Sequence, residues 1–124
     1  MSEVTAHSRL AYTQAFRVSD ASADKVLQPG WFALVDGDVD PSPLIYPVGT
    51  LVVIERTRKG LTERSIRRVN RRTKKWCELS CHTTVRRFHR DRVHVPTKGE
   101  TVKVVGIVIG GSFEIAKGSR GRRG

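Results

Sequence analysis

The sequence has few of the residues that hold small secreted or membrane proteins together. Only two of its 124 residues are cysteines, so we expect no disulfide scaffold and a reducing, cytoplasmic environment. The apolar runs of the chain, such as residues 51–54 and 104–109, are much shorter than the roughly 18 residues that a membrane span needs. The N-terminus also lacks a basic segment followed by an apolar one. We therefore expect neither a secretory signal nor a membrane contact.

The motifs of common enzymes are missing as well. There is no G-x-S-x-G elbow and no G-x-x-x-x-G-K phosphate loop, which argues against common hydrolases and nucleotide enzymes. Cys77 and Cys81 lie near three histidines, but their C-x3-C spacing differs from the C-x2-C of zinc knuckles, and two small core residues would have the same spacing. The histidines are His82, His89 and His94. We expect no metal, no cofactor and no small-molecule substrate.

Positive charge is abundant and unevenly placed. Lys and Arg number 23 against 12 Asp and Glu, for a formal charge of +11. Residues 1–55 carry three cations and seven acids, whereas residues 56–124 carry 20 cations and five acids, for net charges of −4 and +15. This asymmetry predicts a basic face with an anionic partner, which is DNA or an acidic protein surface. Alternatively, the acidic half packs against the basic half within one chain.

Short β-branched runs between Pro- and Gly-rich segments predict a mainly β domain of about six or seven short strands. Residues 1–15 form a flexible start, residues 16–116 the single domain, and residues 117–124 a disordered basic tail. One helical turn is expected within the domain, at residues 23–27. The strands are expected at residues 16–18, 31–35, 51–54, 93–96, 101–109 and 113–115, in addition to the segment described next.

Residues 64–80 show two conflicting patterns. Ile66 and Val69 are three apart, which suits a helix, but residues 76–80 have the pattern of a strand. We predict a basic hairpin, with strands at 64–69 and 76–80. Farther along the chain, Gly106 interrupts a long β-branched run, which predicts a bulge or a close approach of another backbone.

The basic hairpin is one candidate binding site, for nucleic acid or an acidic protein. Single-strand binders interleave cations with exposed aromatic rings on which bases stack. Trp76 follows two lysines, so it is either such a ring or a lid on the core, and the sequence leaves both open. The candidate binding residues are Arg64, Arg67, Arg68, Arg71, Arg72, Lys74 and Lys75.

Several segments, taken together, resemble a known family. Residues 32–38 (FALVDGD) are similar to the strand and G-D that lead into a nucleophile segment, and residues 47–55 (PVGTLVVIE) to the strand that follows it. Residues 65–69, 76–80 and 105–109 then match later strands in order and spacing. The family is the C-terminal domain of LexA and phage repressors, a Ser–Lys self-cleaving peptidase with the signal-peptidase-like fold. The resemblance implies a small LexA/signal-peptidase-like β-barrel or sandwich.

The resemblance also implies that the catalytic dyad has been lost. The family has a serine directly after G-D, where this chain has Val39, and a lysine where this chain has Arg67. Valine has no nucleophilic atom, and a guanidinium stays protonated and cannot act as a base. Ser42 is a displaced candidate nucleophile, but it would need Lys59 or Lys103 as its partner.

The function that the resemblance implies is regulatory rather than catalytic. It is that of an inactive domain of phage or prophage origin that serves transcription regulation and self-association as a homodimer. Repressors of the family carry a helix-turn-helix before this domain, and about 30 residues are too few to hold one. The chain is therefore expected to be either an isolated domain or a stand-alone protein.

Overall fold

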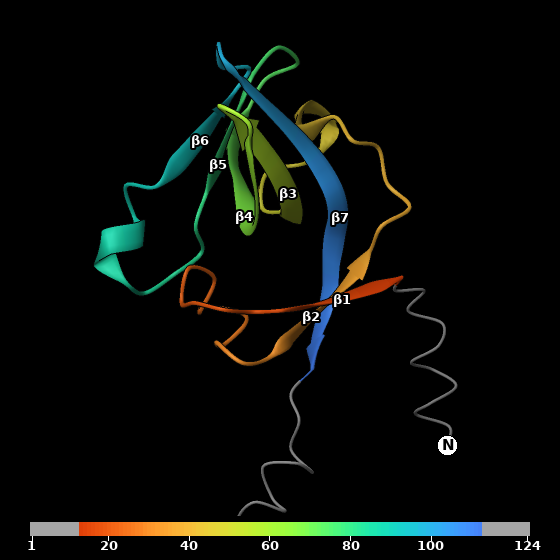
Figure 1. Ribbon diagram of the computed structural model, residues 1–124, viewed down its shortest axis with the longest axis vertical. Coiled ribbons are helices and arrows are strands. Elements are labelled where there is room, and N and C mark those ends of the chain that lie inside the picture. Colours follow the sequence, from red (N-terminus) through yellow and green to blue (C-terminus); the bar gives the residue numbers. More distant parts are fainter. Residues whose placement is uncertain (1–12, 113–124) are drawn as a thin grey trace, which may run out of the picture.

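The computed structural model describes residues 13–112 and consists of one antiparallel sheet of seven strands (Figure 1). The order across the sheet is β1-β2-β7-β3-β4-β5-β6, with β1 and β6 at its edges, so the sheet is open rather than a closed barrel. The mainly β prediction is thus confirmed. The strands are β1 (Gln14–Arg17), β2 (Phe32–Asp36), β3 (Leu51–Arg58), β4 (Leu61–Arg72), β5 (Cys77–Ser80), β6 (Arg92–Val95) and β7 (Glu100–Ser112).

The three long strands β3, β4 and β7 form the centre of the sheet. The predicted hairpin between β4 and β5 is confirmed, but β4 is longer than expected because its first half pairs with β3. The two-residue turn between β3 and β4 has positive φ angles at Lys59 and Gly60, which suits a tight hairpin. Pairing with β3 therefore extends β4 into a polar, charged segment that shows no alternation of apolar and polar residues.

Irregular segments connect the strands and cover the sheet at one end. The helical turn expected at residues 23–27 is a single hydrogen-bonded turn, in which the amides of Val26 and Leu27 both donate to the carbonyl of Ala23. Short 3-10 helices lie at η1 (Pro43–Ile45) and η2 (Arg86–Phe88). The strand predicted at 113–115, the basic tail at 117–124 and most of the flexible start at 1–15 lie outside the described residues, while β1 begins at Gln14.

Two apolar cores lie on opposite faces of the sheet, because successive residues of β3 point to opposite sides. Val52 and Ile54 belong to the first core and Val53 to the second. The first core lies between β3, β4, β5, β6 and β7 and consists of Tyr46, Val52, Ile54, Val69, Cys77, Leu79, Val93 and Val104. The second lies near β1 and β2 and consists of Val18, Leu27, Ala33, Val35 and Val53.

The prediction for Gly106 is confirmed. The β3–β7 register shifts between Val53 and Ile54, directly opposite this part of β7. A Cβ atom on Gly106 would lie 2.0 Å from Cγ1 of Val35 and 3.1 Å from the carbonyl oxygen of Asp36. Only glycine lets β2 and β7 pack this closely.

Candidate functional site

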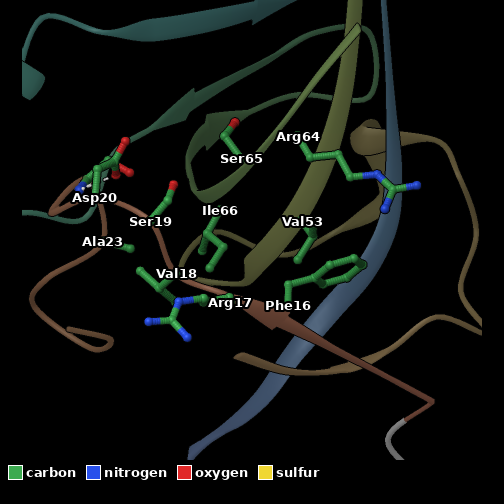
Figure 2. Close-up of a pocket in the computed structure, with 11 residues that line it drawn as sticks. Phe16, Arg17, Val18, Ser19, Asp20, Ala23, Val53, Arg64, Ser65 and Ile66 are labelled. Carbon is green, nitrogen blue, oxygen red and sulfur yellow. Dashed lines mark hydrogen bonds between the residues drawn. The ribbon is translucent and has the colours of Figure 1, made fainter. Parts of the chain in front are cut away.

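A pocket of about 190 Å³, open to solvent, lies beside the second core. Figure 2 shows Phe16 and Arg64 on one side of it and Asp20 on the other. Its three charged side chains have partners: Arg64 pairs with Glu55 at 2.9 Å, Asp20 accepts from the amide of Ser22 at 2.9 Å, and the guanidinium carbon of Arg17 lies 5.9 Å from the centre of the Phe32 ring. The described residues that line the pocket include no histidine, lysine or cysteine.

Arg67, at the position of the family's lysine, is buried. It lies opposite Val52 in the β3–β4 ladder, and its side chain is 7% exposed. Its guanidinium donates to the carbonyl of Asp91 at 2.7 Å, pairs with the carboxylate of Asp91 at 3.1 Å, and donates to the hydroxyl of Ser65 at 3.2 Å. Arg67 therefore links β4 to the segment that precedes β6.

The other positions of the expected catalytic dyad also have structural contacts. Val39 packs against the first core, and the hydroxyl of Ser42 caps η1 by accepting a backbone N–H at 3.3 Å. Lys103 pairs with Glu55 at 3.4 Å, and Lys59 lies in the β3–β4 turn. In the described part of the chain, the hydroxyl of Ser42 thus has a backbone partner and not a lysine amine.

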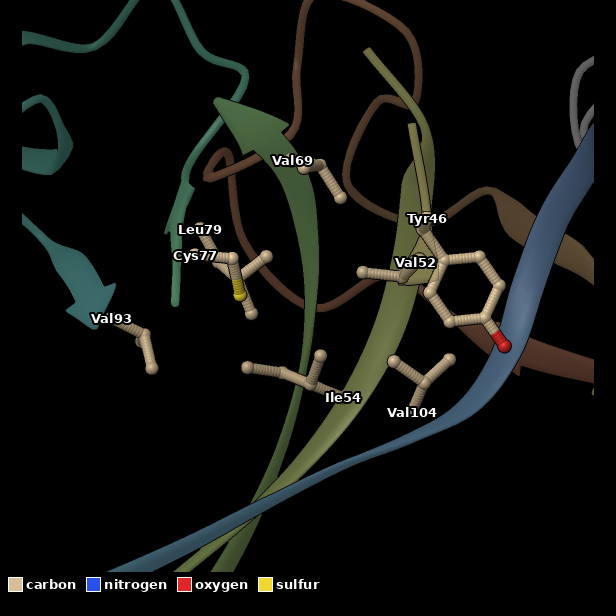
Figure 3. Close-up of a cluster of buried hydrophobic side chains, with 8 residues drawn as sticks. All are labelled: Tyr46, Val52, Ile54, Val69, Cys77, Leu79, Val93 and Val104. Atoms are coloured by element: carbon tan, nitrogen blue, oxygen red, sulfur yellow. The ribbon is translucent and has the colours of Figure 1, made fainter. Parts of the chain in front are cut away.

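Glu78 occupies the middle of β5 and points away from the first core. Its neighbours Cys77 and Leu79 both lie in that core (Figure 3), and side chains alternate along a strand. The carboxylate is only 3% exposed. A buried carboxylate is costly unless it is paired and hydrogen-bonded, so its partners determine its state.

Four side chains from two neighbouring strands surround the Glu78 carboxylate. From β4, Asn70 donates at 2.6 Å and Arg71 at 3.4 Å. From β6, Arg92 donates at 3.2 Å and Nε2 of His94 lies at 3.1 Å. The hydrogen bond from Asn70, followed by those from Arg71 and His94, holds the pKa of Glu78 below its usual value despite burial. This charged carboxylate therefore links three strands.

Five cations lie on the face of Glu78 or in the turn that leads into β5. Cross-strand partners in an antiparallel sheet point to the same side, which places Arg68, Arg71 and Arg92 on the face of Glu78 and Ser80. β5 has four residues, so roughly 10 Å separates its ends. We call this surface the basic face and define it by Arg68, Arg71, Lys74, Lys75 and Arg92.

The structure divides the seven basic residues that the sequence singled out. Arg68, Arg71, Lys74 and Lys75 lie together, whereas the buried Arg67 does not reach this surface. Arg72 pairs with Cys77 and points to the opposite face, where its guanidinium donates to the carbonyl of Leu44. Arg64 lies near the other end of β4, where its guanidinium carbon is 5.3 Å from the centre of the Phe16 ring. Arg92 was missed, because only the pairing of β6 with β5 brings it to this face. The segment between β5 and β6 carries three more exposed cations, Arg86, Arg87 and Arg90.

The cysteines and histidines considered as metal ligands are not brought together. Cys77 lies in the first core, while His94 contacts Glu78 on the opposite face. Across residues 13–112, no three His, Cys, Asp or Glu side chains form a group that could hold a metal ion. Within the same residues, no helix has both the length and the apolar character needed to cross a membrane.

Comparisons of the chain with protein-family models, with curated proteins and with solved structures found no match. The likeness to the LexA and phage-repressor domain therefore remains a resemblance between sequence segments. The geometry and charge of the basic face are the remaining guide to function.

Proposed function

We propose that the protein is a non-catalytic binding module that contacts nucleic acid through its basic face. The observation that carries this proposal is the set of five cations around the carboxylate of Glu78, on the face of β4, β5 and β6 opposite the first core and in the adjoining turn. Nucleic acids favour such surfaces because each neutralised phosphate releases condensed counterions. The same charges could attract an acidic protein, which the experiment below distinguishes.

The contacts of Glu78 support this proposal in a second way. Glu78 bonds to Arg71 and Arg92, whose side chains remain 66% and 45% exposed. Two arginines that are already positioned lose less side-chain entropy when they bind a phosphate. Because one carboxylate neutralises at most one of them, positive charge remains for a partner.

The proposed module has no catalytic step. Val39 supplies no nucleophile, and Arg67 stays charged and is bonded to Asp91. We expect the chain to remain full length during prolonged incubation at alkaline pH, which would deprotonate a catalytic lysine, as checked by mass spectrometry. Fragments that vanish in a Ser42→Ala variant would contradict this expectation. The repressor-type regulatory role and the homodimer stay predictions from the resemblance, and both are compatible with a binding module.

Reversing two charges on the basic face tests the proposed function. Lys74→Glu/Lys75→Glu changes two exposed side chains of the turn before β5, and we expect roughly tenfold or greater loss of affinity for DNA at low salt. The matched control is Arg17→Glu/Lys25→Glu, which changes the net charge equally at exposed positions of the acidic half. Gel-shift titrations with single-stranded and duplex DNA give the affinities, and circular dichroism confirms folding.

The two double variants separate a local site from a general effect of charge. If the basic face is the site, the control binds within about threefold of the wild type. Equal losses in both variants would show that only the net charge matters and would contradict the proposal. So would the absence of DNA binding at low salt, which would leave an acidic protein as the partner.

A further inference from the structure

We infer that the basic face takes single-stranded rather than duplex nucleic acid, with an unpaired base stacked on Trp76; this inference rests on the proposed function. The first observation is the exposure of the ring. Trp76 is 39% exposed and belongs to neither core cluster. A substantial part of this large aromatic ring therefore lies at the surface, which favours the surface ring over the lid on the core.

The turn that carries Trp76 is held by hydrogen bonds. The amide of Thr73 donates to the carbonyl of Trp76 at 2.7 Å, which closes the turn. The hydroxyl of Thr73 accepts from the amides of Lys75 at 3.1 Å and Trp76 at 3.2 Å. A ring presented on a fixed backbone loses little conformational freedom when a base stacks on it.

Cations lie around the ring. The guanidinium carbon of Arg71 is 6.0 Å from the centre of the Trp76 ring, and Arg71 is also bonded to Glu78. Lys74 and Lys75 precede the ring in the same turn, and both are exposed. A phosphate chain that follows these cations would bring its bases within reach of the ring.

Apolar surface lies near the same end of β4. Ile45 is 51% exposed and Val48 is 55% exposed, in a loop that runs beside the end of this strand. The loop is attached by the guanidinium of Arg72, which donates to the carbonyl of Leu44 at 2.9 Å, and by the pairing of residue 49 with residue 69. Such side chains can contact the flat face of a base or a sugar, but not a phosphate.

The combination of ring, cations and apolar surface favours unpaired nucleotides. A duplex buries the faces of its bases, so it would leave Trp76 and the apolar side chains without a partner, whereas single strands offer a base face beside each phosphate. An acidic peptide could meet the cations, but a continuous polyanion suits a face with five cations and one carboxylate better.

The test compares Trp76 variants on three probes of about 12 units, namely labelled oligothymidine, an abasic phosphate chain and a DNA duplex. We expect the wild-type protein to bind oligothymidine more tightly than the other two. Trp76→Ala should weaken oligothymidine binding by roughly 5- to 150-fold and leave binding of the abasic chain nearly unchanged, while Trp76→Phe retains most of the affinity. Binding should also quench tryptophan emission in the wild type but not in Trp76→Phe, a readout that stands even if Trp76→Ala does not fold.

The outcomes separate this inference from the proposed function. Oligothymidine binding that Lys74→Glu/Lys75→Glu weakens but Trp76→Ala leaves unchanged would overturn the inference and support the proposed function. Tighter binding of the duplex than of oligothymidine would do the same. A failure of all three probes to bind at low salt would overturn both.

Discussion

Alanine in place of Gly106 should lower the free energy of unfolding by about 3 kcal/mol, at the upper end of the usual range for an overfilled core. The added methyl group would lie 2.0 Å from Cγ1 of Val35, a residue with no exposed surface, and 3.1 Å from the carbonyl of Asp36. Neither neighbour can move easily, because Val35 belongs to the second core and the carbonyl oxygen of Asp36 is part of the backbone of β2. Urea denaturation at neutral pH measures the change.

Gly110 provides a matched control in the same strand. A Cβ atom there would meet Cδ1 of Leu34 at 3.7 Å, which is an ordinary van der Waals distance. Since alanine is favoured over glycine in strands by roughly 0.5–1 kcal/mol, Gly110→Ala should be neutral or slightly stabilising. Equal effects of alanine at the two positions would contradict the close packing of β2 against β7.

Replacing Glu78 by glutamine should lower the free energy of unfolding by about 2–3 kcal/mol and yet strengthen DNA binding. Hydrogen bonds to a charged group contribute about 1.5–3 kcal/mol each, and this carboxylate links β4, β5 and β6. The cost stays below that of a fully buried ion pair because Arg71 and Arg92 are half-exposed and regain water. Binding rises because the amide oxygen of glutamine can still accept hydrogen bonds from the two arginines and so keep them in position, while the negative charge that competes with phosphate is lost.

The pH dependence of stability provides a second test of the role of Glu78. Because folding lowers the pKa of Glu78, its contribution to stability is fully present above its unfolded pKa, about 4.3, and is lost as the pH falls through the lower folded pKa. The stability difference between the wild type and Glu78→Gln should therefore shrink in acid. A difference that is constant with pH, or weaker DNA binding by the folded variant, would contradict the role given to Glu78.

The sequence predicted those parts of the fold that local patterns encode. The β-branched run that ends at Ile54, the strand pattern of residues 76–80 and the polar turn before Trp76 were sufficient to predict these strands and the basic hairpin. The full length of β4 was missed because its first half is stabilised by pairing with β3, and its exposed, charged residues show no apolar period. Strand ends set by a partner strand leave no trace in the local pattern.

The candidate site was predictable in composition but not in arrangement. Arg67 and Arg68 are adjacent in the sequence, yet they point to opposite faces, and only Arg68 reaches the surface. The partner that buries Arg67, Asp91, is 24 residues away along the chain. The contacts of Glu78 likewise depend on the register of β6, which brings Arg92 beside it. Pairings between residues this far apart in the sequence depend on the tertiary structure, so local sequence patterns do not reveal them.

Binding of the wild-type protein to single-stranded DNA of about 12 nucleotides, measured across roughly 50–200 mM salt, tests most directly whether the basic face takes nucleic acid. If all five cations of the face meet phosphates, the logarithm of the affinity should fall with the logarithm of the salt concentration with a slope of about −3.5, and the slope should be shallower by about 1.4 in Lys74→Glu/Lys75→Glu. An affinity that does not change with salt, or no binding at the lowest salt, would contradict the proposed function.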